Sequence, residues 1–113
     1  MRIAVPYENG NVCSSFTDTT AFKLYDEVSG EVAFSQVVPT SSNRPAALAG
    51  FLADQLVTCL ICAEISDDGK EALEEWGIQL YAGCPGDADQ RVNELLAGTL
   101  KASFSTARGV HHL

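Results

Sequence analysis

Basic residues are scarce in this chain of 113 residues, in which seven lysines and arginines stand against fifteen acidic residues and the formal net charge is −8. The seven basic residues are spread along the chain, so no segment concentrates positive charge. Nucleic acids and anionic membrane surfaces are bound by clusters of lysine and arginine. We therefore expect neither a nucleic acid nor a membrane as a partner.

Long hydrophobic runs are also missing. No stretch approaches the roughly 20 apolar residues of a membrane-spanning helix, and Pro6 interrupts the apolar start of the chain, so no signal peptide is expected. These absences predict a cytoplasmic protein whose four cysteines are thiols. The length predicts a single domain over residues 1–100, followed by a flexible tail over residues 101–113, which show no hydrophobic periodicity.

The usual signatures of catalysis are absent as well. The chain has no P-loop and no GxGxxG motif, and its two histidines, His111 and His112, are adjacent in the expected tail. A Ser–His–acid triad is therefore not expected. The first apolar run, residues 3–5, lacks the acidic residues that two-metal nucleases use to hold magnesium. We predict that the protein is not an enzyme.

Short apolar runs alternate with helical patterns along the chain. Strands are predicted over residues 3–5, 21–25, 31–38, 56–63 and 78–81, and helices start at Pro45, Ser66 and Asp87. Turn residues between the second and third strands predict an antiparallel hairpin, and the later crossovers make the last two strands parallel to the first. The predicted fold is α/β, with a five-stranded mixed sheet, the first strand in its middle and helices on its faces.

Three cysteines end or follow the parallel strands of this predicted sheet. Cys13 lies in the loop after the first strand, Cys62 closes the central strand and Cys84 follows the last one. Since parallel strands end at one edge of a sheet, the thiols are predicted to converge there. Thiolates suit zinc, copper(I) and iron–sulfur clusters, with His111 and His112 as further candidate ligands. The alternative is that these cysteines are buried hydrophobic residues.

The CxxC motif at Cys59 and Cys62 offers a third hypothesis, a thiol redox enzyme. Because the motif lies on a predicted strand, its two side chains are expected to point to opposite faces of the sheet. That arrangement disfavours both a redox pair and a zinc site. Cys59 is therefore predicted to be an unreactive core residue.

Several segments, in one register over about residues 1–100, resemble the dinitrogenase iron–molybdenum cofactor biosynthesis family, which includes the NifX-type carriers. The matching segments are residues 1–6 (MRIAVP), 15–16 (SF), 22–26 (FKLYD), 72–81 (ALEEWGIQLY), 86–87 (GD) and 96–98 (LAG). The resemblance implies a ribonuclease-H-like, three-layer α/β fold. It also implies a protein that binds, carries or assembles an iron–sulfur or molybdenum-containing cluster, with a cluster donor or acceptor protein as its partner.

The resemblance also assigns candidate site residues. It implies cofactor contacts at Ser15, Phe16, Asn43, Ala63 and Glu64, and the metal ligands expected for such a site are the three thiols that the strand order brings together, Cys13, Cys62 and Cys84. The sequence departs from the family where residues 15–17 (SFT) replace His-Phe-Gly, residues 42–43 (SN) replace Gly-His and residues 63–66 (AEIS) replace Gly-Gly-Ile-Gly.

Acidic side chains at Glu64, Asp67 and Asp68 would repel an anionic cluster at a helix N-terminus that otherwise favours anions. The alternative function is therefore a cluster-free regulatory or protein-binding module. The sequence leaves the oligomeric state open.

Overall fold

The computed structural model describes residues 1–106, which form seven strands and three helices. In chain order these are β1 (Arg2–Glu8), β2 (Asn11–Val12), β3 (Ala21–Val28), β4 (Glu31–Pro39), α1 (Pro45–Asp54), β5 (Cys59–Ile61), α2 (Asp67–Glu75), β6 (Gln79–Ala82), α3 (Ala88–Ala97) and β7 (Phe104–Ser105). The predicted helix starts are confirmed. The Ser66 hydroxyl accepts a hydrogen bond from the Gly69 N–H at 3.2 Å, and the Asp87 carboxylate accepts one from the Gln90 N–H at 2.8 Å.

The strands form one mixed sheet in the order β4-β3-β1-β5-β6-β7, with β2 paired to β1 beside this path. β5 runs parallel to β1 and β6, while β3 and β4 form an antiparallel hairpin. This confirms the predicted place of the first strand between the hairpin and the parallel strands. The predicted count of five strands is too low, because β2 and β7 have two residues each and leave no alternating pattern in the sequence.

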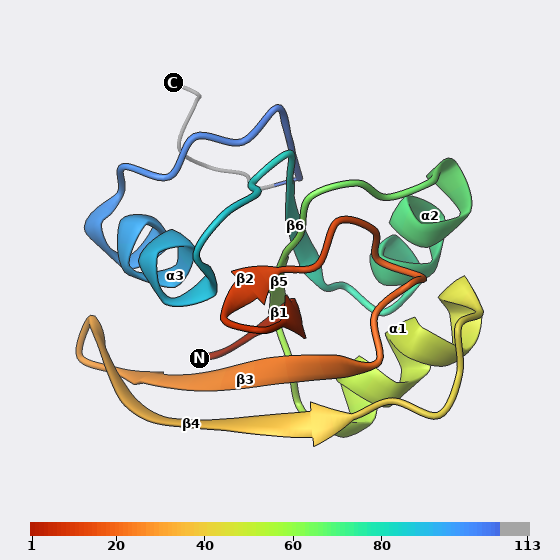
Figure 1. Ribbon diagram of the computed structural model, residues 1–113, viewed down its shortest axis with the longest axis horizontal. Coiled ribbons are helices and arrows are strands. Elements are labelled where there is room, and N and C mark those ends of the chain that lie inside the picture. Colours follow the sequence, from red (N-terminus) through yellow and green to blue (C-terminus); the bar gives the residue numbers. More distant parts are fainter. Residues whose placement is uncertain (107–113) are drawn as a thin grey trace.

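Helices cover both faces of the sheet: α1 and α2 lie on one side and α3 on the other (Figure 1). Two neighbouring residues of β5 show the division. Leu60 belongs to the core cluster of Leu52 and Leu73 from α1 and α2, whereas Ile61 belongs to the cluster of Val92 from α3. Consecutive side chains of a strand point to opposite faces, so β5 is buried on both. The three predicted layers are therefore present.

β5 is shorter than the predicted strand over residues 56–63. Leu56 has a φ of 63° and is 75% exposed, so the chain is still turning there after α1. The first contact with β1 is made by Thr58, which donates its N–H to the carbonyl of Arg2 at 3.1 Å. The strand pairing continues from there, with Leu60 opposite Ala4. Of the residues of the predicted strand that precede β5, only Val57 is buried, and it packs in the α1–α2 core cluster although it lies outside the strand.

β7 was not predicted, because the sequence shows no periodicity after residue 100. Thr106 extends the pairing with β6: its N–H donates to the carbonyl of Leu80 at 3.0 Å, and its hydroxyl accepts from the Leu80 N–H at 2.8 Å. The remainder of the expected tail, with His111 and His112, lies outside the described residues. Within residues 1–106 each helix has nine or ten residues, too few to cross a bilayer.

Candidate functional site

The long loop between β1 and β3 returns to the end of β5 and forms a cleft there. Phe16 donates its N–H to the carbonyl of Glu64 at 3.0 Å, and Glu64 donates its own to the carbonyl of Ser14 at 3.1 Å, so Ser15 and Glu64 form an isolated parallel bridge. A cavity of about 320 Å³ opens beside this bridge and is lined by Ser15, Phe16, Thr17, Glu64, Ile65 and Ser66. We call it the α2 cleft. It brings together three of the predicted cofactor contacts, Ser15, Phe16 and Glu64.

The N-terminus of α2 forms one wall of the α2 cleft. Ser66 caps the helix, and Gly69 in its first turn is buried. A Cβ atom at Gly69 would lie 2.6 Å from Cγ1 of Ile65 and 3.4 Å from Cδ2 of Phe16, so only glycine lets α2 approach the loop this closely. The sequence marked Ser66 as a cap but did not indicate that Thr17 and Ile65 line a cleft, because loop residues carry no periodic signal.

Two predicted cofactor contacts lie elsewhere. Asn43 lines a separate hollow formed by residues 17–20 and 40–43, which meets the α2 cleft only at Thr17. Ala63 is half-buried and packs against the core cluster on the α3 side. Neither residue lines the α2 cleft, because the loop after β4 turns away toward α1 and because Ala63 faces the other layer of the sheet.

The predicted thiol convergence does not produce a metal-binding group. Within residues 1–106 no group of three or more His, Cys, Asp or Glu side chains is placed to hold a metal ion. Cys84 donates its N–H to the carbonyl of Cys62 at 3.0 Å, yet Cys62 packs in the α1–α2 core cluster while Cys84 packs in the α3 cluster. Cys13 is buried near the end of β2. The strands do end at one edge, but the alternation of side chains sends the thiols to different faces.

Burial also favours the protonated thiol at Cys59, Cys62 and Cys84. It raises the pKa of Cys59 and of Cys62 to about 12 each, and it raises the pKa of Cys84 as well. The Cys84 thiol contacts the carbonyls of Ala82 and Lys101, each at 3.7 Å. Metal ligation and thiol exchange both need the thiolate, which these sites disfavour.

The CxxC motif behaves as the strand argument predicted. Cys59 is 1% exposed and packs on the α3 side, whereas Cys62 packs on the α1–α2 side. The two side chains cannot form a redox pair across the sheet backbone. The prediction that Cys59 is a core residue is confirmed.

The charge around the α2 cleft is negative. Glu64 lines it, and Asp67 and Asp68 occupy the first turn of α2. No lysine or arginine is among the residues that line it. Lys70, one turn along α2, lies 3.9 Å from Asp67 and places its ammonium 4.1 Å from the ring centroid of Phe104, away from the cleft. An anion entering here meets carboxylates before it meets a cation.

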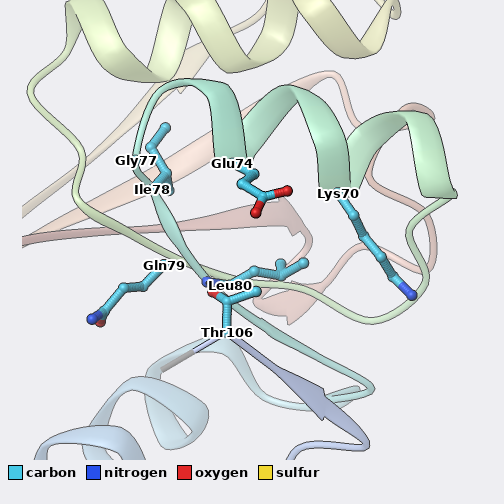
Figure 2. A pocket seen from close by; sticks show the side chains of 7 residues that line it. All are labelled: Lys70, Glu74, Gly77, Ile78, Gln79, Leu80 and Thr106. Atoms are coloured by element: carbon cyan, nitrogen blue, oxygen red, sulfur yellow. Dashed lines mark hydrogen bonds between the residues drawn. The ribbon is translucent and has the colours of Figure 1, made fainter. Parts of the chain in front are cut away.

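A second cavity, of about 260 Å³, lies between α2 and the N-terminal end of β6 (Figure 2). Its lining consists of Lys70, Glu74, Gly77, Ile78, Gln79, Leu80 and Thr106. The side chains of Lys70 and Glu74 project from α2, while Leu80 and Thr106 line the cavity on the side of the sheet. It contains none of the predicted site residues, and it was missed because it depends on the unpredicted pairing of Thr106 with β6.

The model of the family described as dinitrogenase iron-molybdenum cofactor matches residues 1–98. No curated protein matches the sequence.

Solved structures share the fold at low sequence identity. The protein PH0822 has a TM-score of 0.85 and 23% identity, with 92% of this chain and 96% of that chain covered. A Methanocaldococcus jannaschii protein provisionally assigned as a dinitrogenase has a TM-score of 0.76 and 20% identity, covering 90% and 93%. The apo form of the orange protein from Desulfovibrio gigas has a TM-score of 0.77 and 23% identity, covering 90% and 92%. The family match spans most of the chain, and the chain therefore belongs to the dinitrogenase iron-molybdenum cofactor family.

Proposed function

We propose that this protein binds an iron–sulfur or molybdenum-containing cluster as cargo at the α2 cleft, and passes it from a donor protein to an acceptor protein in the cytoplasm without catalysing a reaction. The observation that carries the proposal is the position of the cleft in a chain of this family. It lies at the carboxyl ends of β1 and β5, the edge at which open α/β sheets bind ligands. The proposal includes a ribonuclease-H-like topology for the fold.

The donor set of the cleft is made of oxygen atoms. The hydroxyls of Ser15, Thr17 and Ser66 can donate hydrogen bonds to sulfur or oxygen atoms at the surface of a cluster, and the carboxylate of Glu64 can contact one of its metals. Phe16, which is 1% exposed, closes the bottom of the cleft. This set suits a preassembled cluster that is held by its outer atoms.

The thiols of Cys13, Cys62 and Cys84 are not ligands in this proposal. They are buried, and those of Cys62 and Cys84 have raised pKa values and lie in different core clusters. Substitution of these cysteines distinguishes two kinds of cluster carrier. A site ligated by thiolates would lose its cluster, whereas a site at the α2 cleft would keep it.

Anaerobic incubation with clusters formed beforehand in solution from ferrous iron and sulfide, with and without molybdate, tests the proposal. We expect bound metal after desalting and visible charge-transfer absorption. Thr17→Trp, which fills the α2 cleft, should reduce the bound metal at least tenfold. Thr20→Trp, an exposed position of the same loop outside the cleft, is the matched control and should bind like the wild type.

Cys62→Ala and Cys84→Ala should also leave the bound metal unchanged. Two results would overturn the proposal. One is a wild-type protein that binds no cluster, and the other is a protein that loses its cluster on Cys84→Ala but keeps it on Thr17→Trp.

A second candidate is a cluster-free module that binds a protein partner. The acidic residues Glu64, Asp67 and Asp68 at the cleft favour it, because they oppose an anionic cluster and suit a basic protein segment. In that case metal-free protein should recover a partner from native cells, and Glu64→Lys should abolish the recovery. Cluster binding by the purified protein would contradict it.

A further inference from the structure

β4 is the outermost strand of the sheet and the longest, with nine residues. No other strand of residues 1–106 pairs with its outer edge. All of its residues are exposed except Val38, which is half-buried, and its exposed apolar side chains include Phe34 at 57% and Val37 at 50%. Open edges of this kind are templates for pairing with another strand.

The backbone groups that face outward can be identified from the hydrogen bond that follows the strand. Thr40 donates its N–H to the carbonyl of Thr20 at 3.0 Å. In an antiparallel pair every second residue directs its N–H and C=O to the neighbouring strand. Counting back from Thr40, Gln36 bonds β3, whereas Val37 and Ser35 direct their N–H and C=O away from the sheet.

The regular part of this edge has two ends. The register between β3 and β4 shifts at Asp26 and Glu27, which leaves Ala33 as an extra residue on β4. At the other end, Pro39 has no N–H to donate. The uninterrupted edge therefore runs over residues 34–38, and its midpoint is Gln36.

The edge is nearly neutral in a protein with a net charge of −8. Among the neighbouring residues of β3, the carboxylate of Asp26 lies 2.7 Å from the guanidinium of Arg2, and that of Glu27 lies 3.4 Å from the N-terminal amine. β4 itself carries one charged residue, Glu31, at its first position. A basic partner would find little to attract it here, whereas a second copy would bring no like charges together within residues 34–38.

We propose that β4 pairs antiparallel with β4 of a second copy, across a two-fold axis at Gln36. In this register Ser35 faces the partner's Val37, and both direct their backbone groups into the new ladder. Phe34 faces the partner's Val38 on the α1 side of the sheet, because Val38 packs against the α1–α2 core cluster and Phe34, four residues earlier on the same strand, points to the same face. The exposed side chains of Phe34 and Val37 each gain a cross-strand neighbour, and the two sheets become one.

The pairing is independent of cluster binding, since β4 lines no part of the α2 cleft. Five residues on each side make a small interface, at the weak end of specific association. We expect half-dimerisation at roughly 100 µM, in the range of weak transient contacts. At low micromolar concentration the chain should be a monomer.

Sedimentation equilibrium of the full chain tests the pairing with two variants. Gln36→Lys places two ammonium groups opposite each other on the axis, where like charges destabilise a pair. Val37→Pro removes one outward N–H and leaves the hydrogen bonds to β3 intact. Each should weaken dimerisation at least tenfold without changing the circular dichroism spectrum.

Val28→Lys is the matched control, because it adds the same charge at an exposed position of β3 outside the proposed interface. It should dimerise like the wild type. A wild type that stays monomeric up to about 1 mM, well above the weak range expected here, would overturn the proposal. So would dimerisation of Gln36→Lys and Val37→Pro at wild-type strength.

Discussion

The two halves of the sheet differ in what covers them. In the parallel half every residue of β5 is buried, and helices pack on both faces. In the hairpin half, β4 has no helix over most of its length and is exposed at all positions but one (Figure 1). The same sheet therefore contains a strand that behaves as core and a strand that behaves as surface, three places apart in its order.

The comparison shows that the position of a residue in the fold decides its availability to a ligand more than its residue type does. The cysteines Cys59, Cys62 and Cys84 carry the most reactive chemistry in the chain, but they lie in the covered half and stay protonated. The groups that can meet a ligand or a second copy are hydroxyls, carboxylates and backbone amides at the α2 cleft and along β4. The surfaces that we propose for cluster binding and for pairing are thus built from residues other than the cysteines.

The largest expected effect contrasts one side chain from each half. Leu60→Ala removes a fully buried residue of β5 and should lower the free energy of unfolding by about 3 kcal/mol, the transfer and cavity cost of such a change. Phe34→Ala removes a side chain of β4 that is 57% exposed and should cost less than about 1 kcal/mol. Urea denaturation measures both. Equal costs would show that the hairpin half is as well packed as the parallel half.

The next effect concerns two glycines in helices. Gly69→Ala would bring a Cβ within 2.6 Å of the Ile65 side chain at the α2 cleft, so we expect a loss of about 2 kcal/mol from overpacking. Gly50→Ala in α1 is the matched control, because its Cβ would lie 3.9 Å from the ring of Trp76, an ordinary contact. It should gain about 0.5–1 kcal/mol from helix propensity. Thermal unfolding of both variants measures these two changes in stability. A stabilised Gly69→Ala would contradict the close packing at the cleft.

A smaller effect tests how the hairpin is held to the rest of the molecule. The carboxylate of Asp89 in α3 lies 2.8 Å from the ammonium of Lys23 and 2.6 Å from the hydroxyl of Tyr25, and these bonds lower the pKa of Asp89. Its stabilisation is therefore present above the usual aspartate pKa and is lost as the pH falls through the lowered value. Because Asp89 is 62% exposed, Asp89→Asn should cost only about 0.5–1 kcal/mol at pH 7.

The difference between wild type and Asp89→Asn should vanish in acid, which pH-dependent urea denaturation can follow. Asp18→Asn, which removes the same charge at an exposed loop position, is the matched control. A difference that persists below the lowered pKa would mean that the introduced amide disturbs packing and not charge.

The fold could be read from the sequence where the signals were long enough. Apolar runs, the hairpin turn and the caps at Ser66 and Asp87 predicted the order of the central strands and the helix starts. Strands of two residues carry no period, so β2 and β7 were missed, and with them the cavity at Thr106. The length of β5 was overestimated because the apolar run includes Leu56, which is exposed, and Val57, which is buried in the core without belonging to the strand.

The site could be predicted only to the level of the sheet edge. Topology brought Ser15 and Glu64 together, as expected from strands that end at one edge. It could not decide on which face a thiol lies, since one residue more or less in a strand end reverses the direction of Cys62 or Cys84. Asn43 was placed by family resemblance alone, and the loop that holds it takes another course.

The smallest expected effect is a lack of reactivity, and it tests the comparison at the level of single thiols. All four cysteines are buried in the folded chain, and Cys59 and Cys62 have pKa values of about 12. A thiol reagent at pH 8 should therefore label the native protein slowly, and all four sites should react at once in urea. Ser35→Cys places a fifth thiol on exposed β4 and should add one fast-reacting group. Rapid labelling of a native cysteine would show that the covered half opens locally, and that its thiols are available to a metal after all.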